Sequence, residues 1–218
     1  MIRLPAFLCA VLLAGAAPAA AQLSPGTSGF SSAPTAANDE EYFYMLRQLG
    51  PCLASNKRDR AIAFLAAPID SEEETAAFDA LFDRSANRCL QNFVSATMVR
   101  SWVRGVVAEG LFKDAMREWP EGAAPVIEEP ASIASIHDFA RCYVALDFAA
   151  ARSLLEETRL GDKSELARMR ELAPTFGRCL PEGSDVTLKP MNIRMALAEA
   201  LYHATRDPST ARAPGEAG

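Results

Sequence analysis

The segment RGVVAEGL at residues 104–111 is matched, 90 residues further along the chain, by RMALAEAL at residues 194–201. The two segments share an arginine at the first position, Ala-Glu in the middle and a leucine at the end. Around these residues, apolar side chains recur at helical spacing: Val103, Val106, Val107 and Leu111 in the first copy and Ile193, Leu197 and Leu201 in the second, which predicts a helix in each. Such a helix, present twice, predicts a fold built from two copies of one helical unit.

The positions of the cysteines support the same offset of 90 residues between the two copies. Cys52 and Cys89 are 37 residues apart, and so are Cys142 and Cys179. Sliding residues 52–112 onto 142–202 without a gap gives 12 identities in 61 positions, and both cysteines are among them. Because two cysteines, Arg-Cys-Leu and the charged helix pattern all coincide in one register, we interpret the chain as a tandem duplication.

The chain has five cysteines, and we expect Cys9 to be removed with the signal peptide described below. The other four favour disulfides in a chain of this size, and the residues alone allow three pairings. A duplicated unit should carry a duplicated bond, which favours Cys52 with Cys89 and Cys142 with Cys179. Each bond would stabilise its unit by roughly 3 to 4 kcal/mol on the chain-entropy model. A redox or metal role is the alternative, but the chain has no Cys-x-x-Cys motif and no zinc-ligand pattern that combines a histidine with cysteines.

Helical spacing of apolar residues dominates both units, so the predicted fold class is all-α, with roughly four helices in each copy. Ser71 followed by three glutamates is a strong helix start. Residues 185–189 are the only stretch that suggests a strand. We place the first helical unit at residues 38–117 and the second at 135–206, with a proline-rich linker at 118–134 between them.

The first 21 residues have a basic start, a short apolar run and small residues before Ala21, which predicts a cleaved signal peptide. Residues 22–37 and 207–218 lack apolar periodicity, so we expect a disordered leader and a disordered tail. These features predict a periplasmic or secreted protein. We expect no membrane insertion after cleavage, because no later stretch is long and apolar enough.

The charge of the chain limits its partners. The formal net charge is −6, and removing the signal peptide, which contains one arginine and no acid, makes it −7. Nucleic acids and anionic lipids require a cationic surface, so neither is an expected partner. An unknown protein or another component of the cell envelope remains the expected partner.

The repeated polar residues are the remaining candidates for a site: Arg88, Arg178, Arg104, Arg194, Glu109 and Glu199. We interpret them as scaffold contacts that tie the last helix to the third helix within each unit. The alternative is a helix-borne glutamate, Glu109 or Glu199, with a raised pKa that cleaves an envelope polymer.

The two histidines, His137 and His203, occupy non-equivalent repeat positions, opposite Arg47 and Lys113. We expect surface or capping roles for both, since a metal site would need carboxylates that the sequence does not identify. The sequence therefore predicts no catalytic residue, no cofactor and no metal site.

Four motifs carry a resemblance to a known group of proteins: Phe-x-x-Cys at 139–142, Ala-Arg-x-Leu-Leu at 151–155, Arg-Cys-Leu-Pro-x-Gly at 178–183 and Arg-x-x-x-Ala-Glu-Ala-Leu-Tyr at 194–202. This pattern resembles that of uncharacterised secreted proteins of alphaproteobacteria. The first unit matches more loosely, and Gly105 and Gly110 depart from the pattern. The resemblance implies a periplasmic setting and no particular activity.

The sequence thus predicts an exported envelope protein that acts as a non-catalytic interaction or scaffold module, with its partner in the groove or face between the units. The alternatives are the envelope-polymer hydrolase and a stress-linked structural protein without a small ligand.

Overall fold

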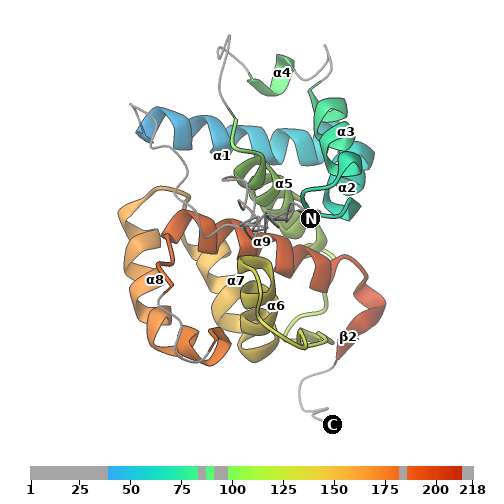
Figure 1. Ribbon diagram of the computed structural model, residues 1–218. Coiled ribbons are helices and arrows are strands. Elements are labelled where there is room, and N and C mark those ends of the chain that lie inside the picture. Colours follow the sequence, from blue (N-terminus) through green and yellow to red (C-terminus); the bar gives the residue numbers. More distant parts are fainter. Residues whose placement is uncertain (1–38, 83–86, 91–97, 182–185, 213–218) are drawn as a thin grey trace, which may run out of the picture.

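The computed structural model describes residues 39–82, 87–90, 98–181 and 186–212 of the 218-residue chain. Helices dominate this part of the chain, which confirms the all-α prediction (Figure 1). Helices α1 to α4 lie on one side of the molecule, and α6 to α8 lie on the other. Helices α5 and α9 lie between them.

Each half contains the same order of elements. The first half comprises α1 (Asp39–Asn56), α2 (Arg58–Ala66), α3 (Glu72–Leu81), the short α4 (Asn87–Leu90) and α5 (Arg100–Ala115). The second comprises α6 (Ile136–Leu146), α7 (Phe148–Glu157), α8 (Lys163–Phe176), the 3-10 turn η2 (Gly177–Cys179) and α9 (Pro190–Thr205).

Local signals explain where several helices begin. The hydroxyl of Ser71 accepts a hydrogen bond from the backbone of Glu74, so α3 begins where the Ser-Glu-Glu-Glu pattern predicts. Ser135 and Asp138 form a complete capping box at the start of α6. Pro190 occupies the first position of α9, where its missing N–H is not needed.

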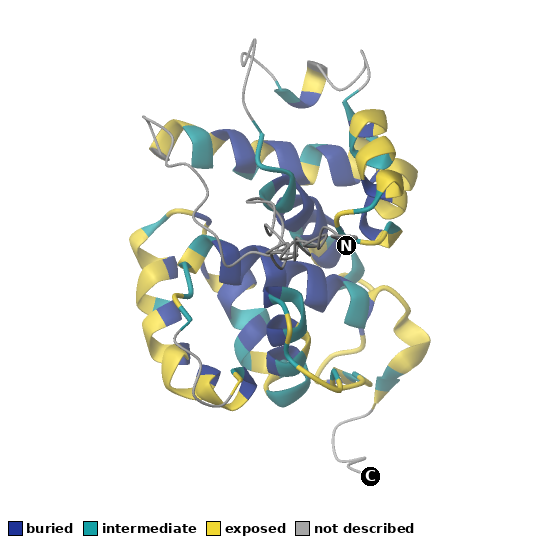
Figure 2. Ribbon diagram, in the orientation of Figure 1, coloured by how far each residue is buried: buried dark blue, intermediate teal, exposed yellow. Residues whose placement is uncertain are grey.

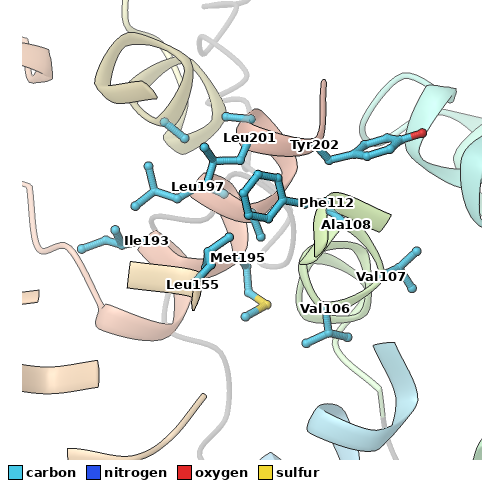
Figure 3. Close-up of a cluster of buried hydrophobic side chains, with 14 of the residues drawn as sticks. Val106, Val107, Ala108, Phe112, Leu155, Ile193, Met195, Leu197, Leu201 and Tyr202 are labelled. Carbon is cyan, nitrogen blue, oxygen red and sulfur yellow. The ribbon is translucent and has the colours of Figure 1, made fainter. Parts of the chain in front are cut away.

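Helices α5 and α9 form the centre of the core and pack against each other more extensively than any other pair of described elements. Figure 3 shows Val106, Val107, Ala108 and Phe112 of α5 beside Ile193, Met195, Leu197, Leu201 and Tyr202 of α9, with Leu155 of α7. These residues are buried, and burial colours in Figure 2 concentrate along the same two helices. The pattern RGVVAEGL and its match therefore form the buried interface between the two halves.

Close backbone approach explains two glycines of α5. A Cβ on Gly105 would lie 2.4 Å from the Cβ of Met195, and a Cβ on Gly110 would lie 2.8 Å from the Cβ of Ala54. Gly105 therefore allows α9 to approach α5, and Gly110 does the same for α1. Both glycines are among the positions at which the first unit departs from the pattern of the second.

The structure contains the disulfides Cys52–Cys89 and Cys142–Cys179, which confirms the predicted pairing. The first joins α1 to α4, and the second joins α6 to η2. Two disulfides indicate an oxidising compartment. Among the described helices, none is both long and apolar enough to cross a membrane.

The structure differs from the sequence-based expectations in three places. Residues 186–189 form no strand. Ala124–Pro125 (β1), in the expected linker, pairs antiparallel with Ala211–Arg212 (β2), in the expected tail. Leu166 is 40% exposed, although its spacing suggested the buried face of α8. The expected signal peptide and leader lie outside the described residues.

Candidate functional site: two matched pockets between the halves

Two buried arginines, Arg104 of α5 and Arg194 of α9, organise the junction between the halves. Their exposed fractions are 2% and 0%. A buried guanidinium must have carboxylate and carbonyl partners, because it cannot lose its charge. Each arginine therefore fixes the positions of several elements at once.

The partners of Arg104 come from both halves. Its Nε donates to Oε1 of Glu199 on α9 at 2.7 Å, and its Nη1 donates to Oε1 of Glu74 on α3 at 3.1 Å. The same guanidinium donates to the carbonyl oxygens of Phe64 and Leu65 at the end of α2. Arg104 thus ties its own half together and binds it to the other half.

Arg194 repeats this arrangement. Its guanidinium donates to both oxygens of Glu109 on α5, at 2.8 and 3.0 Å, and lies 3.5 Å from Glu165 on α8. It also donates to the carbonyl oxygens of Leu154 and Thr158 at the end of α7. Phe64 and Leu154 are 90 residues apart, as are the two arginines, so this contact corresponds in the two halves. The second carbonyl does not, because Leu65 and Thr158 are not equivalent positions.

The repeated charges therefore make two kinds of contact, one within each half and one between the halves. The arginines tie the last helix of each half to its third helix, as we expected. The glutamates differ from that expectation, because Glu109 and Glu199 each bind the arginine of the opposite half. The paired units are thus joined through reciprocal ion pairs.

Both cross-half carboxylates are held in their ionised form. Burial would raise the pKa of Glu109, but the charges of Arg194 and Lys113 outweigh it and lower the pKa below its ordinary value. Burial would likewise raise the pKa of Glu199, but hydrogen bonding to His203 and the charges of His137 and Arg104 lower it. Neither group resembles a carboxylic acid kept protonated near neutral pH.

Each cross-half glutamate lies in a pocket. The first, which we call the lysine pocket, has a volume of about 460 Å³ and surrounds Glu109. Its walls come from α1, α5 and the loop after α7, including Arg47, Lys113 and Asp162. Lys113 donates to Glu109 at 2.7 Å, and Arg47 pairs with Asp162 at 3.0 Å.

The second, which we call the histidine pocket, has a volume of about 440 Å³ and surrounds Glu199. Its walls come from α6, α9 and the loop after α2, including His137, Arg141, His203 and Arg206. His137 Nδ1 lies 3.4 Å and His203 Nε2 lies 3.6 Å from the Glu199 carboxylate.

The two pockets occupy corresponding places. Arg47 and His137 are 90 residues apart, as are Lys113 and His203, and Glu109 and Glu199. Volumes of this size suit small ligands. The structure thus places the histidines in a shared pocket rather than in the surface or capping roles we expected.

The remaining candidates lie elsewhere. Arg88 and Arg178 are exposed on α4 and η2, beside the disulfides and away from both pockets. Trp102 donates to the side chain of Asn192, 90 residues away, so equivalent positions of the two halves meet each other. In the described part of the chain, no cluster of His, Cys, Asp and Glu could hold a metal ion.

Sequence reasoning missed Glu74 and Glu165, the third-helix partners of the arginines. Their roles match closely: Oε2 of Glu74 accepts from the backbone of Asp70, and Oε2 of Glu165 accepts from that of Gly161. Asp70 and Gly161 both have positive φ, 65° and 80°. These pairs are 91 residues apart, so a gapless comparison at 90 aligns Glu74 with a serine.

Comparison of this chain with protein-family models, curated proteins and solved structures finds no match. The fold and the site together define an all-α protein with two disulfides and two matched pockets between its halves.

Proposed function

We propose that this protein is an exported, non-catalytic binding module of the bacterial envelope, which holds its partner at the pockets between its two halves. The observation that carries this proposal is the pair of matched cavities, each walled by both halves. Pockets at the junction of two packed units are common places for ligands.

A tandem duplication accounts for this arrangement. The arginine contacts, the disulfides and the pocket walls correspond at a spacing of 90 or 91 residues. A duplicated ancestor that once paired with a second copy of itself would give such reciprocal contacts across a local two-fold axis.

Binding accounts for the glutamates better than hydrolysis does. A general acid works best with a pKa raised toward the operating pH, whereas the pKa of Glu109 and that of Glu199 are lowered. Both carboxylates are also engaged by a buried arginine, so neither is free to protonate a leaving group. They act as the connection between the halves.

An exported location agrees with the two disulfides and with the signal-like first 21 residues. Mass spectrometry of the non-reduced protein from periplasm would report its first residue. A chain that begins at Gln22 supports export, whereas a chain that retains residues 1–21 in the cytoplasm contradicts it.

The binding role is tested by filling each pocket. Gln48→Trp places a large side chain at an exposed wall of the lysine pocket, and Ala66→Trp does so in the histidine pocket. Ser55→Trp and Ala63→Trp are matched controls, because they are exposed on the same two helices but line neither pocket.

A partner that co-purifies from periplasm at fixed stoichiometry should be recovered at least about tenfold less with one pocket-filling variant and unchanged with its control. Equal recovery with all four variants would contradict the proposal. So would hydrolysis of envelope polymer by the wild type that is abolished by Glu109→Gln or Glu199→Gln.

A further inference from the structure

The histidine pocket gathers four basic side chains from two helices. His137 and Arg141 are one turn apart on α6, and His203 and Arg206 are one turn apart on α9. Residues three or four apart share a helix face, so each pair points to the same side of its helix. These are the only two histidines in the chain, and both line this cavity.

Among the described residues, two of these cations have no carboxylate within ion-pair distance, Arg141 and Arg206, and both are exposed. The chain as a whole has more acids than bases, 28 against 22, so these arginines are not a consequence of composition. In the lysine pocket, Arg47 and Lys113 are paired with carboxylates, and only the exposed Arg159 has none within that distance in the described part of the chain.

The acidic groups of the histidine pocket are already engaged. Glu199 accepts from Arg104 at 2.7 Å. Asp138 accepts from the backbone and the hydroxyl of Ser135 as part of the capping box. Arg104 is neutralised by Glu199 and Glu74, so the cations that remain at the mouth of the pocket are Arg141 and Arg206. Asp207 follows Arg206 in the chain but is not among the residues that line the pocket.

We propose that the histidine pocket binds a small molecule through a carboxylate or phosphate group, held by Arg141 and Arg206. This inference rests on the proposed binding function and names the ligand chemistry of one of its two pockets. The planar guanidinium group offers paired donors that match an oxyanion, which explains arginine rather than lysine at both positions. The cavity volume of about 440 Å³ accommodates a metabolite-sized ligand.

His137 makes this binding depend on pH. It faces Glu199 of α9, Arg104 of α5, Asp138 of its own helix and Glu74 of α3. His203 also faces Glu199, and Arg206 lies one turn away. Burial is the main cause that lowers the pKa of His137 below its ordinary value. A bound anion favours the protonated imidazole, and by linkage the anion binds more tightly as pH falls.

The two imidazole groups provide a direct readout. We would titrate the full oxidised protein with sulfate, whose charge is constant between about pH 6 and pH 8, and follow the two imidazole C–H signals by NMR. We expect saturable shifts of both signals, with a Kd at least about fivefold lower at the acidic pH. Acetate in place of sulfate reports whether a carboxylate suffices.

The double variant Arg141→Gln/Arg206→Gln should raise the Kd for sulfate at least about tenfold. Its control is Arg170→Gln/Arg178→Gln, which removes the same charge from exposed positions outside both pockets and should leave the Kd unchanged. Imidazole signals that do not respond to either anion, or equal weakening in both double variants, would overturn the inference. A stoichiometric partner still displaced by pocket filling in that case would leave the proposed binding function standing.

Discussion

The lysine pocket and the histidine pocket share one framework and differ in what surrounds it. In both, a glutamate of one half binds a buried arginine of the other. Around Glu109 the additional cation is Lys113, whereas around Glu199 the corresponding groups are His203 and His137. Substitution of the buried arginine or glutamate would be costly, because it would leave the other charge buried without its partner. The exposed residues of the pocket walls are not restricted in this way, and it is at these residues that the two pockets differ chemically.

The largest effect should come from removing either buried arginine. Arg194→Met and Arg104→Met each leave buried carboxylates without their cation, so each should lower the free energy of unfolding by about 3 to 5 kcal/mol. Urea denaturation of the oxidised protein measures this. Arg170→Met, at an exposed position, is the control and should stay within about 0.5 kcal/mol. A loss below 1 kcal/mol (~0.2 of the expected effect) for Arg194→Met would contradict the framework role.

The same two variants should distinguish the histidine pocket from the lysine pocket by the pH dependence of their stability. Glu199 lies beside His137, whose charge in acid would partly replace that of Arg104, so Arg104→Met should lose less stability near pH ~6 than near pH ~8. Both histidines of the chain line the histidine pocket and not the lysine pocket, so the loss in Arg194→Met should not follow histidine titration. An identical pH dependence in both variants would show that the histidines do not compensate for the arginine.

The disulfides should contribute nearly equally to the two halves. Each closes a loop of 37 residues, so Cys52→Ala/Cys89→Ala and Cys142→Ala/Cys179→Ala should each cost about 3 to 4 kcal/mol. Urea denaturation of the two double variants compares them directly. A difference greater than about 2 kcal/mol would mean that the halves are not equivalent in how their unfolded chains are restrained.

A smaller effect is expected at the crossing of α5 and α9. Gly105→Ala places a methyl group 2.4 Å from the Cβ of Met195, so it should cost about 1 to 3 kcal/mol. Adding Met195→Ala keeps the Cβ of residue 195 but removes the sulfur, which would lie 2.5 Å from the new methyl group, so a double-mutant cycle should give a favourable coupling of about 1 kcal/mol. Gly177→Ala is the control, because its Cβ would meet nothing within 4 Å and its φ is −55°. Equal losses at Gly105 and Gly177 would contradict the close approach.

The smallest effect concerns the pH dependence of stability. The pKa of His137 is lowered in the folded protein, chiefly by burial, so below its unfolded value of about 6.5 the unfolded chain binds more protons. His137 therefore contributes stability above that pH that is lost as pH falls. In sulfate-free buffer, His137→Gln should flatten the decline of the unfolding free energy below about pH 6.5. A wild type and variant that decline in parallel would show that His137 does not titrate in this way.

Much of the framework could be predicted from sequence because it rests on periodicity and on cysteine spacing. The apolar pattern around Arg104 and Arg194 predicted helices, and the shared spacing of 37 predicted both disulfides. These signals are local or depend on a single alignment register. The reciprocal pairing of Glu109 and Glu199 was not predicted, because nothing in one unit's pattern says which half supplies the partner.

The roles of Glu74 and Glu165, the glutamates of the third helices, were not predicted for a different reason. One additional residue in the loop before α8 shifts Glu165 to a spacing of 91 from Glu74, and glutamates at the start of α3 resemble ordinary dipole-favoured acids. The histidine pocket could have been predicted from the alignment of His137 and His203 with Arg47 and Lys113 at the spacing of 90 residues. Recognising a pocket from that observation requires knowing that α6 and α9 pack together, which is a property of the tertiary structure.

The reciprocal ion pairs also impose an order on folding during synthesis. A ribosome produces the first half well before α9, so the contacts of Arg104 with Glu199 and of Glu109 with Arg194 cannot form until α9 has been made. Until then, Glu109 has no buried arginine beside it, and Arg104 has only the partners of its own half. The junction between the halves is therefore completed only after the second half has been synthesised.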